Sequence, residues 1–210
     1  KDVCGFNVTI PFKEIIKKKI SFLDEHSNKI GAVNCVSKVN NNWVGQNTDW
    51  VGFSKSIERV INSCKTKKAI VIGYGGVSKA IIYSLKKNGF SEIKIYNRTA
   101  SKIPNELKKI TIGLEDLSKQ MDFSDIIINT TPTDVLKKIN FSKENKAIFA
   151  YDVIYNPKET DFLSHFNPDQ RIYGISMLVQ QASPCFERWF GIKPIINKEI
   201  YDVLDKEITT

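Results

Sequence analysis

The pattern of apolar and polar positions changes near residue 68, and the later part of the chain has a simple repeating order. Beyond this point, short and almost wholly apolar segments alternate with stretches of helical spacing. We expect strands at 69–72, 93–96, 110–112, 125–129 and 147–152. Buried apolar strands separated by helices are typical of a parallel sheet covered on both faces. We therefore predict an α/β fold with a doubly wound parallel-sheet (Rossmann-like) domain.

The helices of this later part follow from the same periodicity. One is expected to carry Val77, Ile81 and Leu85 and to end at Asn88-Gly89. Another is expected over 100–109. Each follows a predicted strand, which is the order that a parallel sheet requires.

The first part of the chain follows other patterns. Residues 3–9 predict a strand that is broken at Ile10-Pro11, and a helix is expected near 12–19. Short apolar segments on both sides of the asparagines at 40–42 predict a hairpin, and 50–61 has helical spacing. These elements predict a second, smaller α/β unit.

The chain returns to helix near its end. One apolar stripe is expected to contain Leu178, Gln181, Ala182, Cys185, Phe186 and Trp189, and another helix follows near 196–206. This helix pair has no strand to accompany it in the parallel sheet, so we expect it to pack back across the first part of the chain. The domains are therefore predicted as 1–49 with 174–210, and 50–173.

Composition narrows the function classes. The hydrophobic content of 41% is ordinary for a globular protein, and no apolar run approaches a membrane span, so we expect a cytoplasmic protein without a membrane partner. The net charge of +8 comes from scattered lysines without interleaved aromatics, so we expect no nucleic-acid partner. The four cysteines lack CxxC spacing, which indicates reduced, packed thiols and no metal site.

A glycine-rich loop follows the first apolar strand and begins a helix. Its glycines, Gly73, Gly75 and Gly76, allow a tight turn and a close approach of backbone to a pyrophosphate. The next strand ends in Asn97-Arg98-Thr99, with Lys102 close behind, where an acidic residue would hold the ribose of NAD. Because a guanidinium and a hydroxyl suit a 2′-phosphate, we predict NADP as the cofactor of the 50–173 dinucleotide-binding domain.

Lys13 and Asp49 are the candidate chemical pair. Lys13 lies in the first turn of its predicted helix, where the helix dipole disfavours an ammonium and a nearby carboxylate such as Asp49 favours it. A lysine and a carboxylate beside a dinucleotide loop suit proton transfer coupled to hydride transfer. Two interpretations remain open from the residues alone, because both side chains are also typical solvated surface charges.

Gln181 is a second candidate. It lies in the apolar stripe of its helix, where an amide is unfavourable unless it is hydrogen-bonded. Pro184 removes a helical hydrogen bond and is expected to kink the helix nearby. Both features suit a position that faces a ligand, although a buried glutamine also often satisfies a backbone group.

The residues resemble the shikimate dehydrogenase family, in motifs that run in order along nearly the whole chain. The motifs are Asn7-Val8-Thr9-Ile10-Pro11-Phe12-Lys13, Gly31-Ala32-Val33-Asn34, Gly45-Gln46-Asn47-Thr48-Asp49, Gly73-Tyr74-Gly75-Gly76, Asn97-Arg98-Thr99, Asn129-Thr130-Thr131-Pro132, Asp152-Val153-Ile154-Tyr155-Asn156-Pro157 and Gly174-Ile175-Ser176-Met177-Leu178-Val179-Gln180-Gln181. The resemblance implies an NADP-dependent oxidoreductase that reversibly reduces 3-dehydroshikimate to shikimate in aromatic amino-acid biosynthesis. Its partner is that small-molecule substrate, and we expect a monomer or homodimer.

The resemblance also implies a role for each site residue. Lys13 and Asp49 would be the catalytic pair, with Asp49 also binding substrate. The other substrate-binding residues would be Thr9, Asn34, Tyr155 and Gln181, with Tyr155 near the carboxylate end. The nicotinamide site would be lined by residues near Thr131, Val153 and Gly174.

One departure affects the substrate domain. The family begins with a strand–helix region whose serine pair holds the substrate carboxylate, and this chain starts at Lys1, so we expect that region to be absent and the domain truncated. Two alternatives follow. One is a quinate/shikimate dehydrogenase that uses NAD, against which Arg98 argues, and the other is a non-catalytic NADP-binding fragment.

Overall fold

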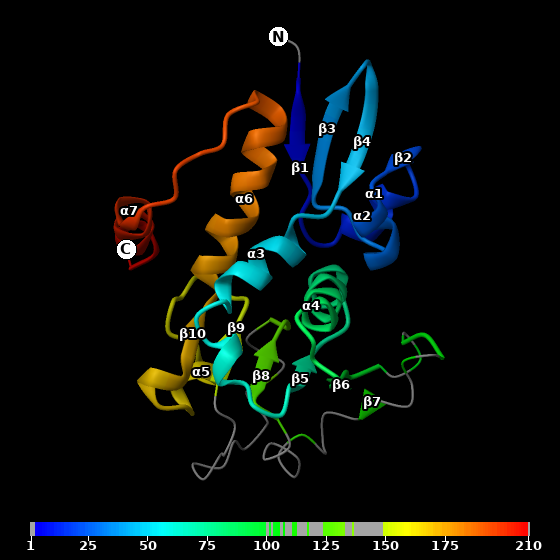
Figure 1. The fold of residues 1–210 in the computed structure, drawn as a ribbon. Coiled ribbons are helices and arrows are strands. Elements are labelled where there is room, and N and C mark those ends of the chain that lie inside the picture. The colour runs from blue at the N-terminus through cyan, green and yellow to red at the C-terminus, as the bar shows by residue number, and fades with distance from the viewer. Residues whose placement is uncertain are drawn as a thin grey trace.

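The computed structural model places two sheets one above the other, with helices between them (Figure 1). It describes residues 3–99, 101, 103–105, 107, 111–112, 117, 124–132, 136 and 149–209. Most of the helix expected over 100–109 lies outside these residues. The two sheets correspond to the two patterns of the sequence.

The first sheet has four strands in the order β1-β3-β4-β2. Its strands are β1 (Gly5–Asn7), β2 (Phe22–Leu23), β3 (Cys35–Val39) and β4 (Asn42–Gln46). β3 and β4 form the predicted hairpin, and both Asn40 and Asn41 at its turn have positive φ, which asparagine tolerates better than most residues. The helices α1 (Lys13–Lys17) and α2 (Glu25–Ile30) accompany this sheet.

β2 and α2 were not predicted from the sequence. The helix signals are nevertheless present, because Asp24 caps α2 by accepting a hydrogen bond from the backbone N–H of Ser27, and Gly31 ends it in the left-handed conformation. An element of six residues is too short to give a clear apolar period.

The second sheet is parallel throughout, as predicted. Its order is β10-β9-β8-β5-β6-β7. The strands are β5 (Lys68–Ile72), β6 (Glu92–Tyr96), β7 (Thr111–Ile112), β8 (Ile126–Asn129), β9 (Phe149–Asp152) and β10 (Arg171–Tyr173). β10 was not predicted, because it is a three-residue strand without a fully buried side chain.

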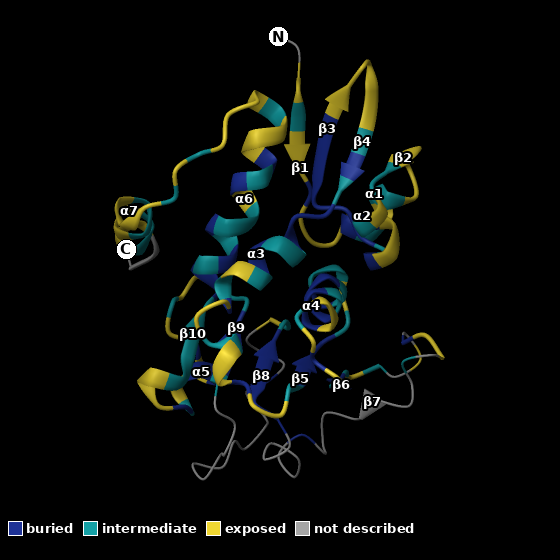
Figure 2. Ribbon diagram, in the orientation of Figure 1, coloured by how far each residue is buried: buried dark blue, intermediate teal, exposed yellow. Residues whose placement is uncertain are grey.

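Alternate residues of the central strands pack into two different cores, which explains why these strands are apolar on both sides. Val71 of β5 and Ile128 of β8 belong to one cluster with Phe53. Ile70 and Ile127 belong to another on the opposite face. Figure 2 shows β5 and β8 buried almost throughout.

Three helices connect the sheets. In Figure 1, α3 (Asp49–Ser56) and α4 (Gly76–Lys87) lie between them, and α6 (Gly174–Phe190) runs alongside both. In the described part of the chain, the other helices are α5 (Asp161–Ser164) and α7 (Lys198–Thr209), with 3-10 turns at Ile61–Ser63 and Pro168–Gln170.

The C-terminal helices take different places. The Trp189 indole of α6 donates a hydrogen bond to the Val36 carbonyl of the first sheet, at 2.9 Å. By contrast, α7 is joined to Lys158, after β9, through Asp205, and to Gln180 of α6 through Tyr201. Of the described hydrogen bonds of this pair, those to the first sheet come from α6.

The predicted apolar stripe of α6 is partly wrong. Ala182 and Phe186 are exposed, whereas Val179 and Ser183 are buried. The reason is that the surroundings of α6 change along its length. In its first half, Met177 packs with Phe53 of α3 and residues of the second sheet. In its second half, Cys185 and Trp189 are hydrogen-bonded to Asn7 and Val36 of the first sheet. A single stripe therefore cannot describe the whole helix, which runs through Pro184.

Candidate active site

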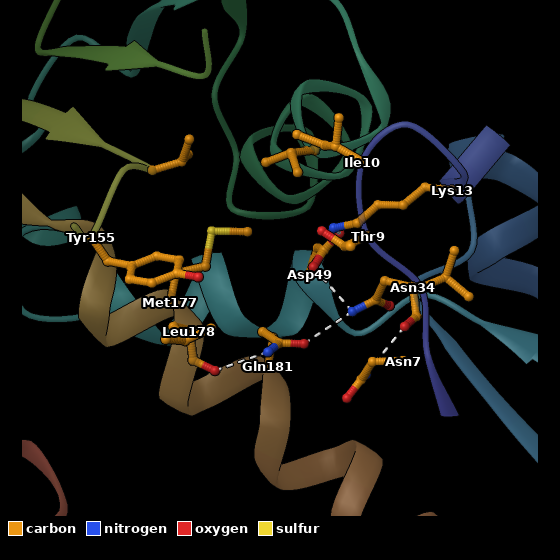
Figure 3. A pocket seen from close by; sticks show the side chains of 14 residues that line it. Asn7, Thr9, Ile10, Lys13, Asn34, Asp49, Tyr155, Met177, Leu178 and Gln181 are labelled. Atoms are coloured by element: carbon orange, nitrogen blue, oxygen red, sulfur yellow. Dashed lines mark hydrogen bonds and ion pairs between the residues drawn. The ribbon is translucent and has the colours of Figure 1, made fainter. Parts of the chain in front are cut away.

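A cavity of about 330 Å³ lies where the first sheet, α1, α3, α6 and the segment after β9 meet. It is lined by Asn7, Val8, Thr9, Ile10, Lys13, Asn34, Asp49, Val77, Val153, Tyr155, Gly174, Met177, Leu178 and Gln181. Figure 3 shows Tyr155 and Met177 on one side of it and Lys13 and Thr9 on the other. One wall of the cavity is therefore mainly apolar, and the other carries most of its polar groups.

Lys13 and Asp49 form a buried ion pair in this cavity. The Lys13 Nζ lies 2.7 Å from the Asp49 Oδ2, and the two residues are 9% and 3% exposed. Each is the first residue of its helix, Lys13 of α1 and Asp49 of α3. A salt bridge between Glu14 of α1 and Lys79 of α4 ties the lysine-bearing helix to the helix that follows the glycine loop. The fold thus brings together the pair that sequence spacing left open.

Asn34 joins the polar residues of the cavity. Its Nδ2 lies 3.0 Å from the Asp49 Oδ1, 3.0 Å from the Gln181 Oε1 and 2.8 Å from the Thr48 Oγ1. Its Oδ1 accepts a hydrogen bond from the backbone N–H of Thr48 at 2.6 Å. Because Asn34 is buried, these bonds hold its amide, and through it Asp49 and Gln181, in one orientation.

Gln181 is positioned by the close crossing of α3 and α6. Its Nε2 donates to the Leu178 carbonyl at 3.0 Å, which leaves its Oε1 toward Asn34. A Cβ at Gly52 would lie only 2.7 Å from the Gln181 Cβ and 2.8 Å from the Met177 carbonyl oxygen. The crossing therefore requires a residue without a side chain at position 52.

The other expected substrate-binding residues, Thr9 and Tyr155, border the same cavity. Sequence reasoning gave no role to Asn7 and Met177, which also line it. Helical spacing is the signal that would have found Met177, because it lies three residues after Gly174 and four before Gln181. Asn7 belongs to the first quoted motif, and in the strand expected over 3–9 it would share a face with Thr9, although the observed strand β1 ends at Asn7.

A second cavity, of about 250 Å³, opens at the glycine loop. Its lining residues are Gly73, Tyr74, Gly75, Tyr96, Asn97, Arg98, Thr99, Thr130, Thr131 and Pro132. Gly73 has a φ of +102°, and a Cβ there would lie 2.5 Å from the Thr130 Oγ1. The Ser78 Oγ accepts a hydrogen bond from the Gly75 N–H, so this serine caps the first turn of α4.

The expected cofactor residues divide between three places. Gly73, Gly75, Asn97, Arg98, Thr99 and Thr131 line the second cavity, whereas Val153 and Gly174 line the first. Gly76 borders a smaller cavity of about 220 Å³ that also touches Gly75 and Lys13. Lys102 lies outside the described residues. The lining of the second cavity contains Arg98 and no carboxylate among the described residues.

Asp152, the last residue of β9, anchors a buried hydrogen-bonded turn beside the cavity. Asp152 accepts hydrogen bonds from the Asn129 amide, the Thr160 hydroxyl and the backbone N–H of Ile154. Burial raises the pKa of this carboxyl, and the three donors oppose the rise. The turn fixes the start of the segment that carries Val153 and Tyr155.

The described residues give no sign of a metal site or of a membrane-spanning helix. No three of their His, Cys, Asp or Glu side chains gather in a way that would hold a metal ion. None of the helices in the described part of the chain combines the length and apolar character needed to cross a membrane.

Two family models match the sequence, "Shikimate dehydrogenase substrate binding domain" over residues 1–36 and "Shikimate / quinate 5-dehydrogenase" over residues 55–160. The shikimate dehydrogenase (NADP(+)) of Caldanaerobacter subterraneus is 39% identical over 203 residues, which are 89% of this chain and 72% of the relative.

Solved structures agree. A chorismate mutase/shikimate 5-dehydrogenase fusion protein from Clostridium acetobutylicum matches with a TM-score of 0.84 at 33% identity, over 98% of this chain and 78% of the other. A shikimate dehydrogenase in complex with NADP+ matches with a TM-score of 0.80 at 32% identity, over 99% of this chain and 78% of the other. The chain belongs to the shikimate dehydrogenase family.

Proposed function

We propose that Lys13 and Asp49 perform the proton transfer of the NADP-dependent shikimate dehydrogenase reaction, the reversible reduction of 3-dehydroshikimate to shikimate. The observation that carries the proposal is their ion pair of 2.7 Å, buried in the wall of the 330 Å³ cavity. An ammonium held in this way faces the cavity with its remaining N–H groups. It is therefore placed to donate a proton to an oxygen bound there.

The proton step follows from this arrangement. When bound, NADPH supplies the hydride that the ketone carbon receives. Lys13 donates a proton to the ketone oxygen, which becomes the hydroxyl of shikimate. Asp49 orients the ammonium and balances its charge, and in the oxidising direction Lys13 takes the proton back. The ion pair already holds the ammonium at the cavity wall, so little reorganisation is needed.

The polar wall suits a polyhydroxylated ring. Asn34 and Gln181 present amide groups fixed by their mutual hydrogen bond, and Thr9 adds a hydroxyl. Fixed donors and acceptors reject a ligand that lacks the matching hydroxyls, because buried polar groups are then left unpaired. Tyr155 is 43% exposed at the rim, where a phenol hydroxyl suits the carboxylate end of the substrate.

The second cavity fits NADP. A Cβ at Gly75 would meet no protein atom within 4 Å, and its φ of −116° is accessible to any residue, so the fold itself does not require glycine there. The space is consistent with close approach of a pyrophosphate to the first amides of α4. Arg98, with Asn97 and Thr99, is the described group suited to the 2′-phosphate, and Gly73 and Gly76 complete the loop.

Domain limits and assembly are part of the proposal. The first sheet with α6 supports a substrate domain of 1–49 and 174–210, and the parallel sheet supports a dinucleotide-binding domain of 50–173. The cavity between them joins residues of both, including Lys13 and Val153. A monomer or homodimer in the cytoplasm remains our prediction.

Turnover of four substrate pairs tests the function: shikimate or quinate, each with NADP+ or NAD+. We expect the highest kcat/KM for shikimate with NADP+. A clear preference for quinate or NAD+ would overturn the choice of substrate or cofactor. The non-catalytic alternative predicts NADP+ binding, measured by calorimetry, with no turnover of either substrate.

A further inference from the structure

Two buried thiols lie directly behind the polar wall of the substrate cavity. Cys35 is the first residue of β3 and Cys185 lies on α6, and neither is exposed. The two thiols are close enough to shift each other's pKa. Asn7 confirms their proximity, because it lies opposite Cys35 in the β1–β3 pair and its Nδ2 donates to the Cys185 Sγ at 3.3 Å. Both thiols are free, and the described mechanism uses neither.

The Cys185 sulfur is hydrogen-bonded to residues of the polar cavity wall and to residues that support it. Besides Asn7, it contacts the Thr48 Oγ1 at 3.2 Å and the Gln181 carbonyl oxygen at 3.4 Å. Asn7 and Gln181 line the cavity, and the Thr48 hydroxyl also binds the Asn34 amide. A chemical change at this sulfur therefore alters hydrogen bonds made by Asn7 and Gln181 directly, and by Asn34 through Thr48.

The pair has the acid–base character of reactive dithiols. The neighbouring Cys35 thiol lowers the pKa of Cys185 to about 7, against the effect of burial, and the Thr48 and Asn7 donors add to the lowering. The pKa of Cys35 is raised, chiefly by Cys185. Near neutral pH, one partner is thus partly a thiolate, which is the nucleophilic form, and the other keeps its proton.

We propose that Cys35 and Cys185 form a redox-active dithiol, which a hydroperoxide oxidises to a disulfide that weakens substrate binding. The effect on substrate rests on the proposed function, whereas formation of the disulfide does not.

The chemistry balances with hydrogen peroxide as the oxidant. The Cys185 thiolate attacks one peroxide oxygen, an S–O bond forms, the O–O bond breaks, and the departing hydroxide takes a proton to become water. The Cys35 sulfur then attacks the sulfenic acid. An S–S bond forms, the S–O bond breaks, and the Cys35 proton leaves with the hydroxyl as a second water. The two thiols lose two electrons, and the peroxide gains them.

The disulfide would act on substrate rather than on cofactor. Once oxidised, Cys185 can neither donate to the Gln181 carbonyl nor accept hydrogen bonds as a thiolate from Asn7 and Thr48. The polar wall loses that support, so the KM for shikimate rises. The glycine loop and Arg98 line a different cavity, so NADP+ affinity stays within about twofold.

The experiment uses the chain with Cys4→Ser, because Cys4 is an exposed thiol that would react independently. The protein is treated with hydrogen peroxide, quenched in acid, alkylated after denaturation and digested. Mass spectrometry should find the Cys35 and Cys185 peptides joined and two hydrogen atoms lighter than their sum. The KM for shikimate should rise at least about tenfold, because one or two supporting hydrogen bonds are lost. Dithiothreitol should restore the original KM.

Three variants make the test specific. Cys35→Ser and Cys185→Ser, each compared with its own untreated activity, should lose the reversible change in KM. Cys64→Ser is the matched control, since Cys64 is also buried but hydrogen-bonds only to the Val60 carbonyl among its described contacts, and burial raises its pKa to about 11. It should respond like the parent.

Two results would overturn the proposal. Recovery of Cys35 and Cys185 as separate alkylated or over-oxidised peptides would exclude the disulfide, whatever the activity. A joined peptide with an unchanged KM would exclude coupling to the substrate cavity. If the chain had no turnover, the mass measurement would still decide whether the disulfide forms, so this failure is distinguishable from failure of the proposed function.

Discussion

Lys13 and Asp49 are 36 positions apart, yet their side chains meet at the N-termini of two different helices. Each is anchored by its own element. The Lys13 carbonyl accepts a hydrogen bond from the Val33 N–H, and the Asp49 N–H donates to the Asn47 side chain. The other Asp49 carboxylate oxygen, Oδ1, accepts a hydrogen bond from the Asn34 amide. The orientation of the pair is therefore fixed before any ligand enters.

Replacing the lysine tests its part in proton transfer. Lys13→Ala removes the group that would donate the proton, so we expect kcat to fall by about 10²–10⁴-fold. NADP+ affinity should change little, because Lys13 does not line the second cavity, which contains Arg98. Steady-state kinetics and cofactor titration measure the two effects. Lys29→Ala is the matched control, since Lys29 also pairs with a carboxylate but on the surface. Full activity of Lys13→Ala would contradict the proposed mechanism.

Removal of the acid alone should destabilise the fold. Asp49→Leu leaves the buried Lys13 ammonium without its partner, which should lower the free energy of unfolding by about 3–5 kcal/mol. Adding Lys13→Met removes the unpaired charge, and the double variant should regain a large part of the loss. Urea unfolding of the parent, both single variants and the double variant measures this coupling. Additive effects would mean that the two charges do not interact in the folded protein.

Gly52 should control the substrate site without touching substrate. Gly52→Ala places a Cβ against the backbone of α6 at Gln181 and Met177, and backbone cannot yield as a flexible side chain does. We expect a loss of about 1–3 kcal/mol in stability and a higher KM for shikimate. Gly75→Ala is the contrasting variant. It meets no protein atom, so it should keep the parent's unfolding curve and weaken NADP+ instead. Equal stability of both variants would show that α3 and α6 can separate freely.

Arg98 should set the preference between the two cofactors. Arg98→Leu removes the described cation of the second cavity. NADP+ should therefore lose about 1.5–3 kcal/mol of binding free energy, which is the usual contribution of a hydrogen bond between charged groups. NAD+ lacks that phosphate and should be affected much less. Ratios of kcat/KM for the two cofactors measure the change. Arg59→Ala, an exposed arginine that does not line this cavity, is the control. Parallel losses for NADP+ and NAD+ would assign Arg98 to another part of the cofactor.

The parallel sheet was predictable because its strands are buried on both faces. Segments such as 69–72 and 126–129 are apolar at every or nearly every position, and no local choice competes with that pattern. The hairpin was predictable from the asparagines that tolerate its turn. The three-residue β10 and the two-residue β2 were not, because their pairing comes from neighbouring strands rather than from their own residues.

The site was predictable in residue types but not in geometry. The motifs and the resemblance named Lys13, Asp49, Asn34 and Gln181, yet local spacing places no residue of α1 beside a residue of α3. Their meeting depends on the order of the first sheet and on the α3–α6 crossing at Gly52, which are tertiary features. The Cys35–Cys185 contact was missed for the same reason, since neither cysteine shows a spacing signal.

The Cys185 thiol should make stability depend on pH near neutrality. Its pKa is lowered to about 7 in the folded chain, against about 8.5 when unfolded, so folding favours the thiolate. The unfolded state then holds more protons between these values, and stability rises with pH through this window. The contribution is fully present above the unfolded pKa and is lost as pH falls through about 7. Relative to Cys185→Ser, the parent should therefore gain unfolding free energy between about pH 6 and about pH 8.

Urea unfolding at both pH values, in the parent and in Cys185→Ser, measures this difference. The ultraviolet absorbance of the thiolate gives an independent reading, with a midpoint of about 7 that the serine variant should lack. The raised pKa of Cys35 acts in the opposite sense, but only as pH passes its unfolded value of about 8.5, above the chosen window. Cys64→Ser should keep the parent's pH dependence, because burial raises the pKa of that thiol. Identical pH slopes for the parent and Cys185→Ser would mean that the buried sulfur stays protonated, and the dithiol would then lack its nucleophile.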